Sequence, residues 1–274
     1  MTREDALVTC YDLRFTVLSM IDIHTHILPE TDDGSHSLAE SVEMCEISAR
    51  DGVEVIVATP HAHDSVHKTH DPALLHQKVD ELNRNLEGNP KIVLGCELRF
   101  THDLVRQVCV DKSAPTIADG PYVLVEFPHS VVPLGSERAL FELMSNQIRP
   151  IIAHPERNHL LMAEPERFYE LVELGVLGQA DTGSFTGQFG KRVQQTAHVM
   201  LEHGLIHIIA SDCHNTRNRL PGMSEAVGVV AELVGADYAK AMADDNPRAV
   251  VEGKPIPTRP APVLPKKRKK WLFF

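Results

Sequence analysis

Residues 20–30 read Met-Ile-Asp-Ile-His-Thr-His-Ile-Leu-Pro-Glu, a short apolar run that carries two histidines, His24 and His26. On an extended strand, residues at positions i and i+2 project from the same face, so both imidazoles can bind one metal ion. A single His-x-His pair is more often incidental than a metal site. The pair therefore predicts a metal centre only if other segments bring further ligands to the same place.

The chain beyond this stretch alternates short apolar runs with helix-like segments. Further strands are expected at 53–59, 91–96, 122–125, 150–153, 176–180 and 205–210. Helices are expected near 38–51, 71–86, 101–110, 136–146, 165–174, 191–203, 223–233 and 236–242. Apolar runs rich in β-branched residues are typical of strands that are buried on both faces. Together with the strand that opens at Met20, these seven alternating units predict a parallel sheet or barrel of the α/β class.

Six of the seven expected strands end in residue types that bind metal ions. In a parallel barrel the carboxyl ends of the strands meet on one rim, where active sites form. With one aspartate from the first loop, the candidate ligands are His24, His26, Asp33, His61, Glu97, Glu126, His154, Asp212 and His214. Nine ligands are too many for one tetrahedral zinc and suit two or three divalent ions bridged by a carboxylate. Any one strand-end carboxylate can instead cap a helix or pair with an arginine, so the prediction depends on the whole set.

Two arginines follow candidate ligands closely. Arg157 lies three residues after His154, and Arg219 lies seven residues after Asp212. Because a planar guanidinium matches phosphate oxygens bidentately, both arginines predict a phosphate clamp. A surface salt bridge is the alternative for each, and Arg217 competes with Arg219. The remaining loop histidines are expected to be exposed or outside the ligand shell: His63, His67, His70, His129 and His159.

Composition limits the class of protein. The 274 residues carry a formal charge of −11, and the five basic residues at 266–270 leave −16 for the rest, so nucleic acid is not an expected partner. Five cysteines at irregular spacing indicate reduced thiols rather than disulfides. No apolar run approaches the roughly 20 residues that span a bilayer, and the first residues lack a signal-peptide pattern, which predicts a cytoplasmic protein.

The chain divides into three expected parts. Residues 1–19 show no period and are expected to be an N-terminal extension without a function, with Met20 as an alternative start. Residues 20–252 form the folded domain. Prolines recur over 253–265, which predicts a stiff, solvated linker, and residues 266–274 combine lysine and arginine with Trp and Phe. This tail is expected either to be disordered or to contact an anionic membrane surface or a partner.

Several phrases resemble the polymerase-and-histidinol-phosphatase (PHP) superfamily. They are the His-x-His strand, Asp-Asp-Gly at 32–34, Ala-Thr-Pro-His at 58–61, Ile-Ala-His-Pro-Glu-Arg-Asn at 152–158 and Ala-Ser-Asp-Cys-His at 210–214. More narrowly, they are similar to the manganese-dependent protein-tyrosine phosphatases that are encoded with bacterial capsule and exopolysaccharide genes. The resemblance runs from Met20 to about Val250. The departures are the extension, Cys213 within the Ser-Asp-x-His phrase, and the basic tail.

This resemblance implies a distorted seven-stranded (β/α)7, TIM-like barrel with three divalent metal ions. By position, His24, His26, Glu97 and Asp212 match the ligands of the first ion; Glu97, Glu126 and His154 those of the second; and Asp33, His61 and His214 those of the third. Asp32 is the alternative to Asp33. Mn²⁺ is the expected metal, and Fe²⁺ and Zn²⁺ suit the same ligands. Arg157 and Arg219 match the family's phosphate-contacting arginines.

The implied function is metal-assisted hydrolysis of phosphotyrosine on a membrane-bound bacterial tyrosine kinase that controls capsule or exopolysaccharide synthesis. A histidinol phosphatase or another small-molecule phosphoesterase is the alternative on the same site, because the fold does not decide the substrate. Cys213 and Arg219 also have the Cys-x5-Arg spacing of cysteine phosphatases, but the residues between them lack the glycines of a phosphate cradle. A non-catalytic regulatory module is the remaining alternative.

Overall fold

The computed structural model describes residues 19–67 and 69–265, so residues 1–18 of the expected extension and the tail at 266–274 lie outside the described residues. The strands are β1 (Met20–Thr25), β2 (Val53–Ala58), β3 (His61–Ala62), β4 (Lys91–Leu94), β5 (Glu97–Arg99), β6 (Tyr122–Glu126), β7 (Arg149–Ala153), β8 (Leu177–Asp181) and β9 (Ile208–Ala210). The longer helices are α1 (Leu38–Arg50), α2 (Pro72–Asn85), α4 (Ser136–Ser145), α6 (Glu166–Leu174), α8 (Lys191–Glu202) and α9 (Ser224–Val234). Shorter turns of helix are α3 (Leu104–Cys109), η1 (Ile117–Asp119), η2 (Pro155–Arg157), α5 (His159–Ala163), α7 (Thr182–Thr186), α10 (Ala236–Lys240), η3 (Ala241–Asp245) and α11 (Asn246–Val251).

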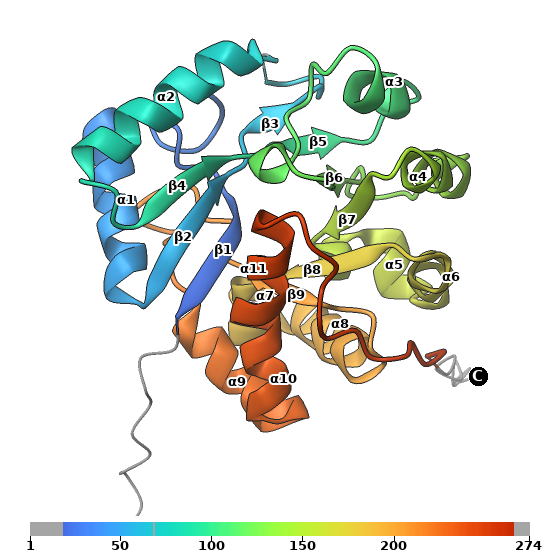
Figure 1. Cartoon of the computed structure of the whole chain (residues 1–274). Helices are drawn as coiled ribbons and strands as arrows, with labels where there is room; N and C mark the ends of the chain where they lie inside the picture. Colours follow the sequence, from blue (N-terminus) through green and yellow to red (C-terminus); the bar gives the residue numbers. More distant parts are fainter. Residues whose placement is uncertain (1–18, 68, 266–274) are drawn as a thin grey trace, which may run out of the picture.

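The strands form two sheets in which every neighbouring pair is parallel. One sheet has the order β1-β2-β4, and the other has the order β3-β5-β6-β7-β8-β9. Figure 1 shows most of the helices on the outside of these strands, with α11 lying in front of them. The predicted α/β class with parallel strands is therefore confirmed.

Two predicted strands, 53–59 and 91–96, are each followed by a second short strand, which gives nine strands among the described residues instead of the expected seven. Pro60 separates β2 from β3, and proline has no backbone N–H to offer a ladder. Gly95 and Cys96 separate β4 from β5. A Cβ on Gly95 would lie 2.9 Å from Val57 Cγ1, so only glycine lets this segment approach β2 so closely. As a result Glu97 opens a strand, where the sequence suggested that it follows one.

The chain after β9 lies beside the end of β1. Asp212 N donates to His24 O at 2.8 Å, and His26 N donates to Cys213 O at 2.9 Å. Thr25 and Cys213 also form an isolated parallel bridge. The two halves of the ligand set, which are almost 190 residues apart in sequence, are thus joined directly by backbone hydrogen bonds.

The buried apolar residues form two clusters. The larger one lies between the strands and the surrounding helices. The smaller one lies among the strands themselves and includes Ile23 of β1, Leu124 of β6 and Val250 of α11. Tyr122, which opens β6, donates its hydroxyl to Lys254 O at 2.7 Å just after α11. Helix α11 therefore packs against the ends of the strands where they begin, opposite the ends that carry the candidate ligands.

Residues 253–265 differ from the solvated linker that the prolines suggested. Thr258 N donates to Asn246 Oδ1 at 3.0 Å, and Val263 N donates to His203 O at 2.8 Å. Ile256 packs against the smaller core cluster. Because proline carries no N–H, an extended proline-rich segment has few donors left to pair, and here the body of the protein accepts from them.

The short helices α5 and α7 were not predicted, and the chain stays helical beyond α10 through the π-helical turn η3 into α11. Helices of five or six residues are too short to show a hydrophobic period. Within 19–67 and 69–265, none of the helices combines the length and apolar character needed to cross a membrane.

Candidate metal centre

All nine predicted ligands gather in one cluster, beside the carboxyl ends of β1, β6, β7 and β9. Their ligand atoms fall into four overlapping groups, each within 4.8 Å. The groups are His26, Asp33, His61 and His214; His24, His26 and Glu97; His24, His154 and Asp212; and His61, Glu97 and Glu126. Each of the nine residues belongs to at least one group, so the structure brings the whole predicted set together.

Glu97 lies at the centre of the cluster and is 1% exposed. Its Oε2 lies 3.4 Å from His24 Nε2, 3.3 Å from His26 Nε2 and 3.0 Å from His61 Nδ1. Its other oxygen, Oε1, lies 2.9 Å from His154 Nε2. A carboxylate whose two oxygens face different histidines is positioned to bridge two cations.

Asp212 connects the cluster to the two predicted arginines. Its Oδ1 lies 3.4 Å from the Nε2 atoms of both His24 and His26. Its Oδ2 accepts from Arg157 NH1 at 2.6 Å and from Arg219 NH2. The competing Arg217 is exposed and uses its backbone N–H to bind Asn215 Oδ1. Among the described residues it is therefore Arg219, not Arg217, that reaches the cluster.

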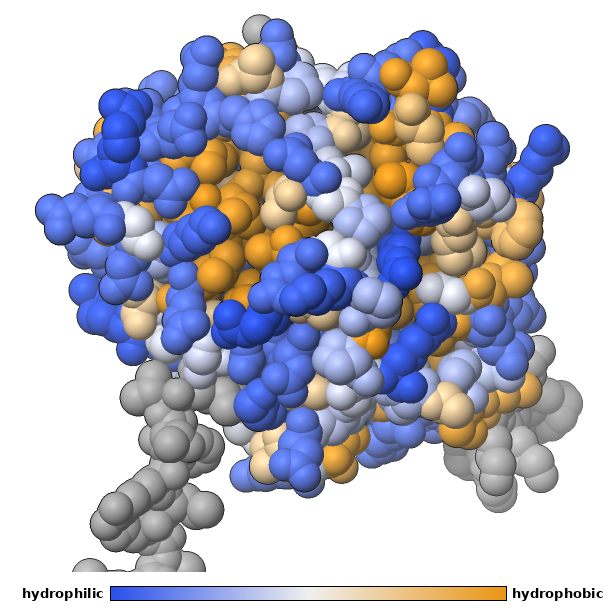
Figure 2. Space-filling model, in the orientation of Figure 1, coloured by the Kyte–Doolittle hydropathy of each residue, from blue (hydrophilic) through white to orange (hydrophobic). Residues whose placement is uncertain are grey.

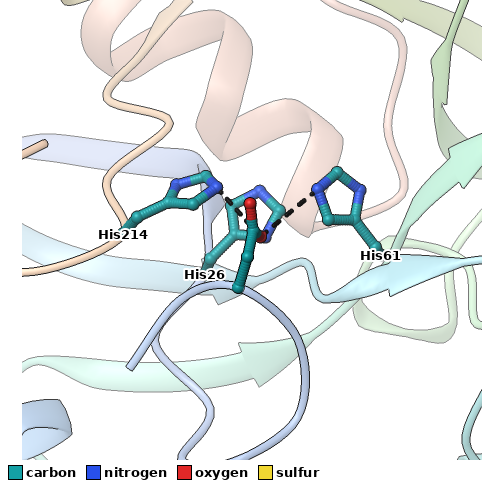
Figure 3. A group of neighbouring side chains, drawn as sticks. His26, His61 and His214 are labelled. Carbon is teal, nitrogen blue, oxygen red and sulfur yellow. Dashed lines mark ion pairs between the residues drawn. The ribbon is translucent and has the colours of Figure 1, made fainter. Parts of the chain in front are cut away.

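The two aspartates of the first loop have different partners. Asp32 Oδ2 accepts from His26 Nδ1 at 2.7 Å, so it contacts the side of the ring that faces away from the cluster. Asp33 Oδ1 lies 3.3 Å from His214 Nε2 and 3.5 Å from His61 Nε2. Figure 3 shows the rings of His61 and His214 on either side of the ring of His26, with dashed lines that mark these two ion pairs. Of the two, Asp33 is the one placed among the candidate ligands.

Gly34 explains how this loop holds its shape. Ser35 N donates to His26 O at 3.0 Å, which folds the loop back onto the His-x-His strand. A Cβ on Gly34 would lie 2.0 Å from His26 O and 2.5 Å from His26 Cβ. Only glycine fits this approach, and the glycine of the Asp-Asp-Gly phrase is therefore what allows both aspartates to reach the site.

The buried carboxylates of the cluster shift the pKa values of the imidazoles beside them. Burial opposes a charge on His24, but Glu97 and Asp212 outweigh it and raise its pKa to about 9. Burial likewise opposes ionisation of Glu97, yet His24 and the neighbouring imidazoles hold the pKa of Glu97 well below its usual value. Burial lowers the pKa of His61 to about 4, which leaves that ring neutral and able to act as a ligand at pH 7. The raised pKa values of His24 and His26 mean that protons would compete with a cation for the same ring nitrogens.

Strand β8, the one predicted strand without a ligand at its end, supports the cluster from behind. Gln179 Oε1 lies 2.9 Å from His24 Nδ1, and Gln179 Nε2 donates to Asp181 Oδ1 at 3.0 Å. Asp181 Oδ2 in turn accepts from Arg157 NH1 at 2.6 Å. Such contacts fix the ring orientation of a ligating histidine. Gln179 was not predicted, because no sequence motif marks a glutamine in the middle of a strand, and Asp181 was not among the predicted ligands although it directly follows the expected strand 176–180.

One loop histidine lies closer to the cluster than expected. The ring of His67 stacks on that of His61, with centroids 4.6 Å apart, and Asp64 Oδ2 lies 2.7 Å from His67 Nδ1. His67 Nε2 is 4.0 Å from Asp33 Oδ1. His67 therefore belongs to the wall of the site, although the sequence offered no reason to separate it from the other loop histidines.

Comparison with known proteins places the chain. The family model described as "Capsular polysaccharide synthesis, CpsB/CapC" matches residues 20–252. Tyrosine-protein phosphatase YwqE of Bacillus subtilis is 37% identical over 258 residues, which cover 93% of this chain and 100% of YwqE. Tyrosine-protein phosphatase CpsB of Streptococcus pneumoniae is 32% identical over 239 residues, with 85% of this chain and 98% of CpsB covered.

Solved structures agree with this placement. A crystal structure from work on YwqE and CpsB, described there as unique metal-dependent tyrosine phosphatases, matches with a TM-score of 0.84 at 35% identity. The match covers 91% of this chain and 100% of that one. A phosphotriesterase from Mycobacterium tuberculosis shares only the fold, with a TM-score of 0.53 at 12% identity. The predicted resemblance is confirmed, and the chain belongs to the CpsB/CapC family of capsular polysaccharide synthesis proteins.

Proposed function

We propose that this protein is a metal-dependent protein-tyrosine phosphatase. The observation that carries the proposal is the convergence of nine metal-binding side chains, with Glu97 and Asp212 among them, and of two arginines on Asp212. The relatives that cover most of this chain are named tyrosine-protein phosphatases, which supports phosphotyrosine as the substrate class. Residues 20–252 form the phosphatase domain.

The donor set fits divalent cations. His61 Nδ1 is buried without a hydrogen-bond partner among the described residues, although it lies 3.0 Å from Glu97 Oε2, so its lone pair is free for a cation. We assign three ions, Mn²⁺ in the first place, with Fe²⁺ and Zn²⁺ as alternatives. The first would be held by His24, His26, Glu97 and Asp212, the second by Glu97, Glu126 and His154, and the third by Asp33, His61 and His214. When bound, such ions supply Lewis acidity and make water nucleophilic at neutral pH.

The arginines act on the phosphate group. Asp212 and Asp181 hold the Arg157 guanidinium at the edge of the cluster, and the ring of Phe189 lies 4.5 Å from its carbon. Arg219 Nε is buried without a partner among the described residues, which leaves a donor for a phosphate oxygen. Phenolate has a pKa of about 10 and leaves readily, so no strong general acid is required of the chain.

We also propose that the nine strands together form a distorted (β/α)7 barrel. If β2 with β3 and β4 with β5 each count as one barrel strand, the barrel has seven strands. The backbone hydrogen bonds between residues 24–26 and 212–213 support closure of the barrel. The barrel matters for function because it gathers strand ends from distant parts of the chain on one rim.

A cysteine mechanism is the clearest rival. Cys213 is fully buried, and burial together with Asp22 raises the pKa of its thiol far above the usual range. A buried, protonated thiol is a poor nucleophile. Cys213→Ser should therefore retain turnover of a phosphotyrosine peptide, while chelation should abolish turnover in both forms. Loss of activity in Cys213→Ser with an unchanged metal content would favour the cysteine mechanism.

The substrate assignment has its own test. We propose that the physiological substrate is the phosphorylated tyrosine segment of a membrane-bound bacterial tyrosine kinase in capsule or exopolysaccharide synthesis. The test compares kcat/KM for a phosphotyrosine peptide and for histidinol phosphate with the same metal-loaded preparation. We expect kcat/KM to be much higher for the peptide. A preference for histidinol phosphate would show that the same metal ligands serve the hydrolysis of a small molecule instead.

A further inference from the structure

A cavity lies at the opposite end of the strands from the metal centre. It has a volume of about 560 Å³ and is lined by residues that open strands, among them Tyr122 and Arg149, together with Ile256 and Arg259 from the segment 253–265. In Figure 1 this segment runs from α11 across the front of the molecule. Figure 2 shows the same face, where hydrophilic side chains cover most of the surface and apolar ones lie between them. The volume is in the range of small-molecule sites.

The charges at this cavity are unusual for an acidic protein. Arg149 and Arg259 both line it, and no Asp or Glu does so within the part of the chain that the structure describes. The protein as a whole has a net charge of −11. Partial burial lowers the pKa of Arg259, with no carboxylate acting against it. The cavity is therefore a local positive region, which attracts anions.

Neutral contacts hold both guanidinium groups in place. Arg149 NH1 donates to the Tyr122 hydroxyl at 3.3 Å, and the guanidinium carbon lies 5.7 Å from the centroid of the Tyr122 ring. Arg259 NH2 donates to Val172 O at 2.7 Å. These contacts orient the two groups without neutralising them, and each guanidinium keeps further N–H donors beyond the one engaged.

We propose that this cavity binds a phosphorylated small molecule, with its phosphate on Arg149 and Arg259. Guanidinium forks match phosphate oxygens in geometry as well as charge. The side chains of Met144, Leu177 and Ile256 form an apolar wall for the uncharged part of such a ligand. The site is separate from the metal centre, and the proposal does not depend on the catalytic function.

A bound phosphate would also join two parts of the protein. Arg149 belongs to β7, whereas Arg259 belongs to the segment 253–265 that crosses the starts of the strands. An anion held by both would restrain this segment against the strands. Its backbone amides, such as those of Thr258 and Val263, should then exchange more slowly with solvent.

Hydrogen exchange on the full chain with phenylphosphonate tests this site. The probe is a phosphate-ester analogue that no phosphatase hydrolyses, and benzyl alcohol is its uncharged control. Saturating phenylphosphonate should slow exchange over residues 256–263. In the double variant Arg149→Met/Arg259→Met, the phenylphosphonate concentration that gives half-maximal protection should rise at least about tenfold. Loss of a hydrogen bond to a charged group weakens binding by at least that factor. Double replacement by lysine should weaken it less, because the charge is kept.

The His24→Ala variant separates this site from the metal centre. It should keep the protection of 256–263 while losing any protection around 212–219. Three results would overturn the proposal: no protection of 256–263 in the unaltered protein, unchanged protection in a Met/Met double variant that melts normally, or loss of that protection in His24→Ala. None of them depends on whether the protein hydrolyses phosphotyrosine.

Discussion

Glu97 shows how a single residue sets what the rim can bind. Its two oxygens contact four imidazoles, and with Asp212 it draws protons onto His24 and His26 in the absence of a metal ion. A divalent ion must displace those protons in order to bind. Metal affinity and pH are therefore linked at this site.

This linkage gives a pH dependence with a definite sign. Because the pKa of His24 is raised to about 9, its ring is protonated at neutral pH in the metal-free protein and loses its proton to the metal. The Mn²⁺ dissociation constant should therefore fall by about tenfold per pH unit, for each proton released, between pH 6.5 and 8.5. Titration calorimetry in buffers of different ionisation enthalpy measures the released protons directly. Binding that neither releases protons nor varies with pH would contradict the ligand role of these histidines.

Gln179 provides a test of the contacts behind the ligands. Gln179→Leu removes the acceptor for His24 Nδ1 and should weaken metal binding by about 10–100-fold, with turnover recovering at high metal concentration. Gln195→Leu, on an exposed position of α8, is the matched control and should change nothing. If the Gln179 variant bound Mn²⁺ like the unaltered protein, the ring of His24 would not need this support.

The sequence predicted which side chains gather in the cluster but not the contacts that orient them. Their gathering was predictable because strand ends of a parallel fold converge, so position alone marked His61 or Glu126. Gln179 and Asp181 were missed because only the fold determines which strand lies behind His24. The choices between Asp32 and Asp33, and between Arg217 and Arg219, depended on side-chain direction, which spacing does not contain.

At the scale of elements, the loop at 30–35 depends on one glycine. Gly34→Ala would bring a Cβ into His26 O and Cβ, so the loop must shift and carry Asp33 away from His61 and His214. We expect about one metal ion fewer per chain and a large loss of turnover, measured by metal analysis and kinetics. Gly228→Ala is the control, since a Cβ there meets nothing within 4 Å, and in helix α9 it should stabilise the fold by up to about 1 kcal/mol. Normal metal content in Gly34→Ala would show that the loop is not required.

The turn η2 contains a buried carboxyl group that lowers stability at neutral pH. Burial and then Asp181 raise the pKa of Glu156 to about 7, while its Oε1 accepts from Asp181 N and Ser184 Oγ. The folded state therefore binds a proton that the unfolded chain releases above its ordinary pKa of 4.5, and stability falls as pH rises from about 4.5 to 7.

Glu156→Gln should remove this dependence, because the amide oxygen still accepts both hydrogen bonds and the group no longer ionises. In urea unfolding of chelated protein we expect the variant to gain up to about 3 kcal/mol over the unaltered chain at pH 8 and nothing at pH 4.5. A variant that is less stable than the unaltered chain at pH 8, yet equally stable at pH 4.5, would show instead that Glu156 is needed in its ionised form.

The element boundaries were less predictable than the elements. The long helices and the buried strands had the expected period and caps, such as Asp71, whose side chain accepts from Ala73 N at the start of α2. The short strands β3 and β5 were missed because they form by pairing with each other and with β6, and a run of two or three residues shows no period in the sequence. The attachment of 253–265 was missed because a proline-rich composition says nothing about which acceptors lie nearby.

Across the whole molecule, the fold separates two sites of opposite character. The metal centre collects acidic and imidazole groups at the carboxyl ends of the strands, and the arginine-lined cavity lies at their starts. The α/β class and the family could be predicted from motif order alone. The arginine-lined cavity could not be predicted, because it exists only where the segment 253–265 crosses strands that are distant from it in sequence.

The most direct measurement is the turnover of a phosphotyrosine peptide by the full chain before chelation, after chelation and after return of Mn²⁺. If the rim is a catalytic metal centre, chelation should reduce turnover by at least about 100-fold and Mn²⁺ should restore it, because the metal makes water nucleophilic. His24→Ala should melt as a folded protein and stay inactive in all three states. Full turnover by chain shown to be free of metal would contradict the metal-dependent mechanism.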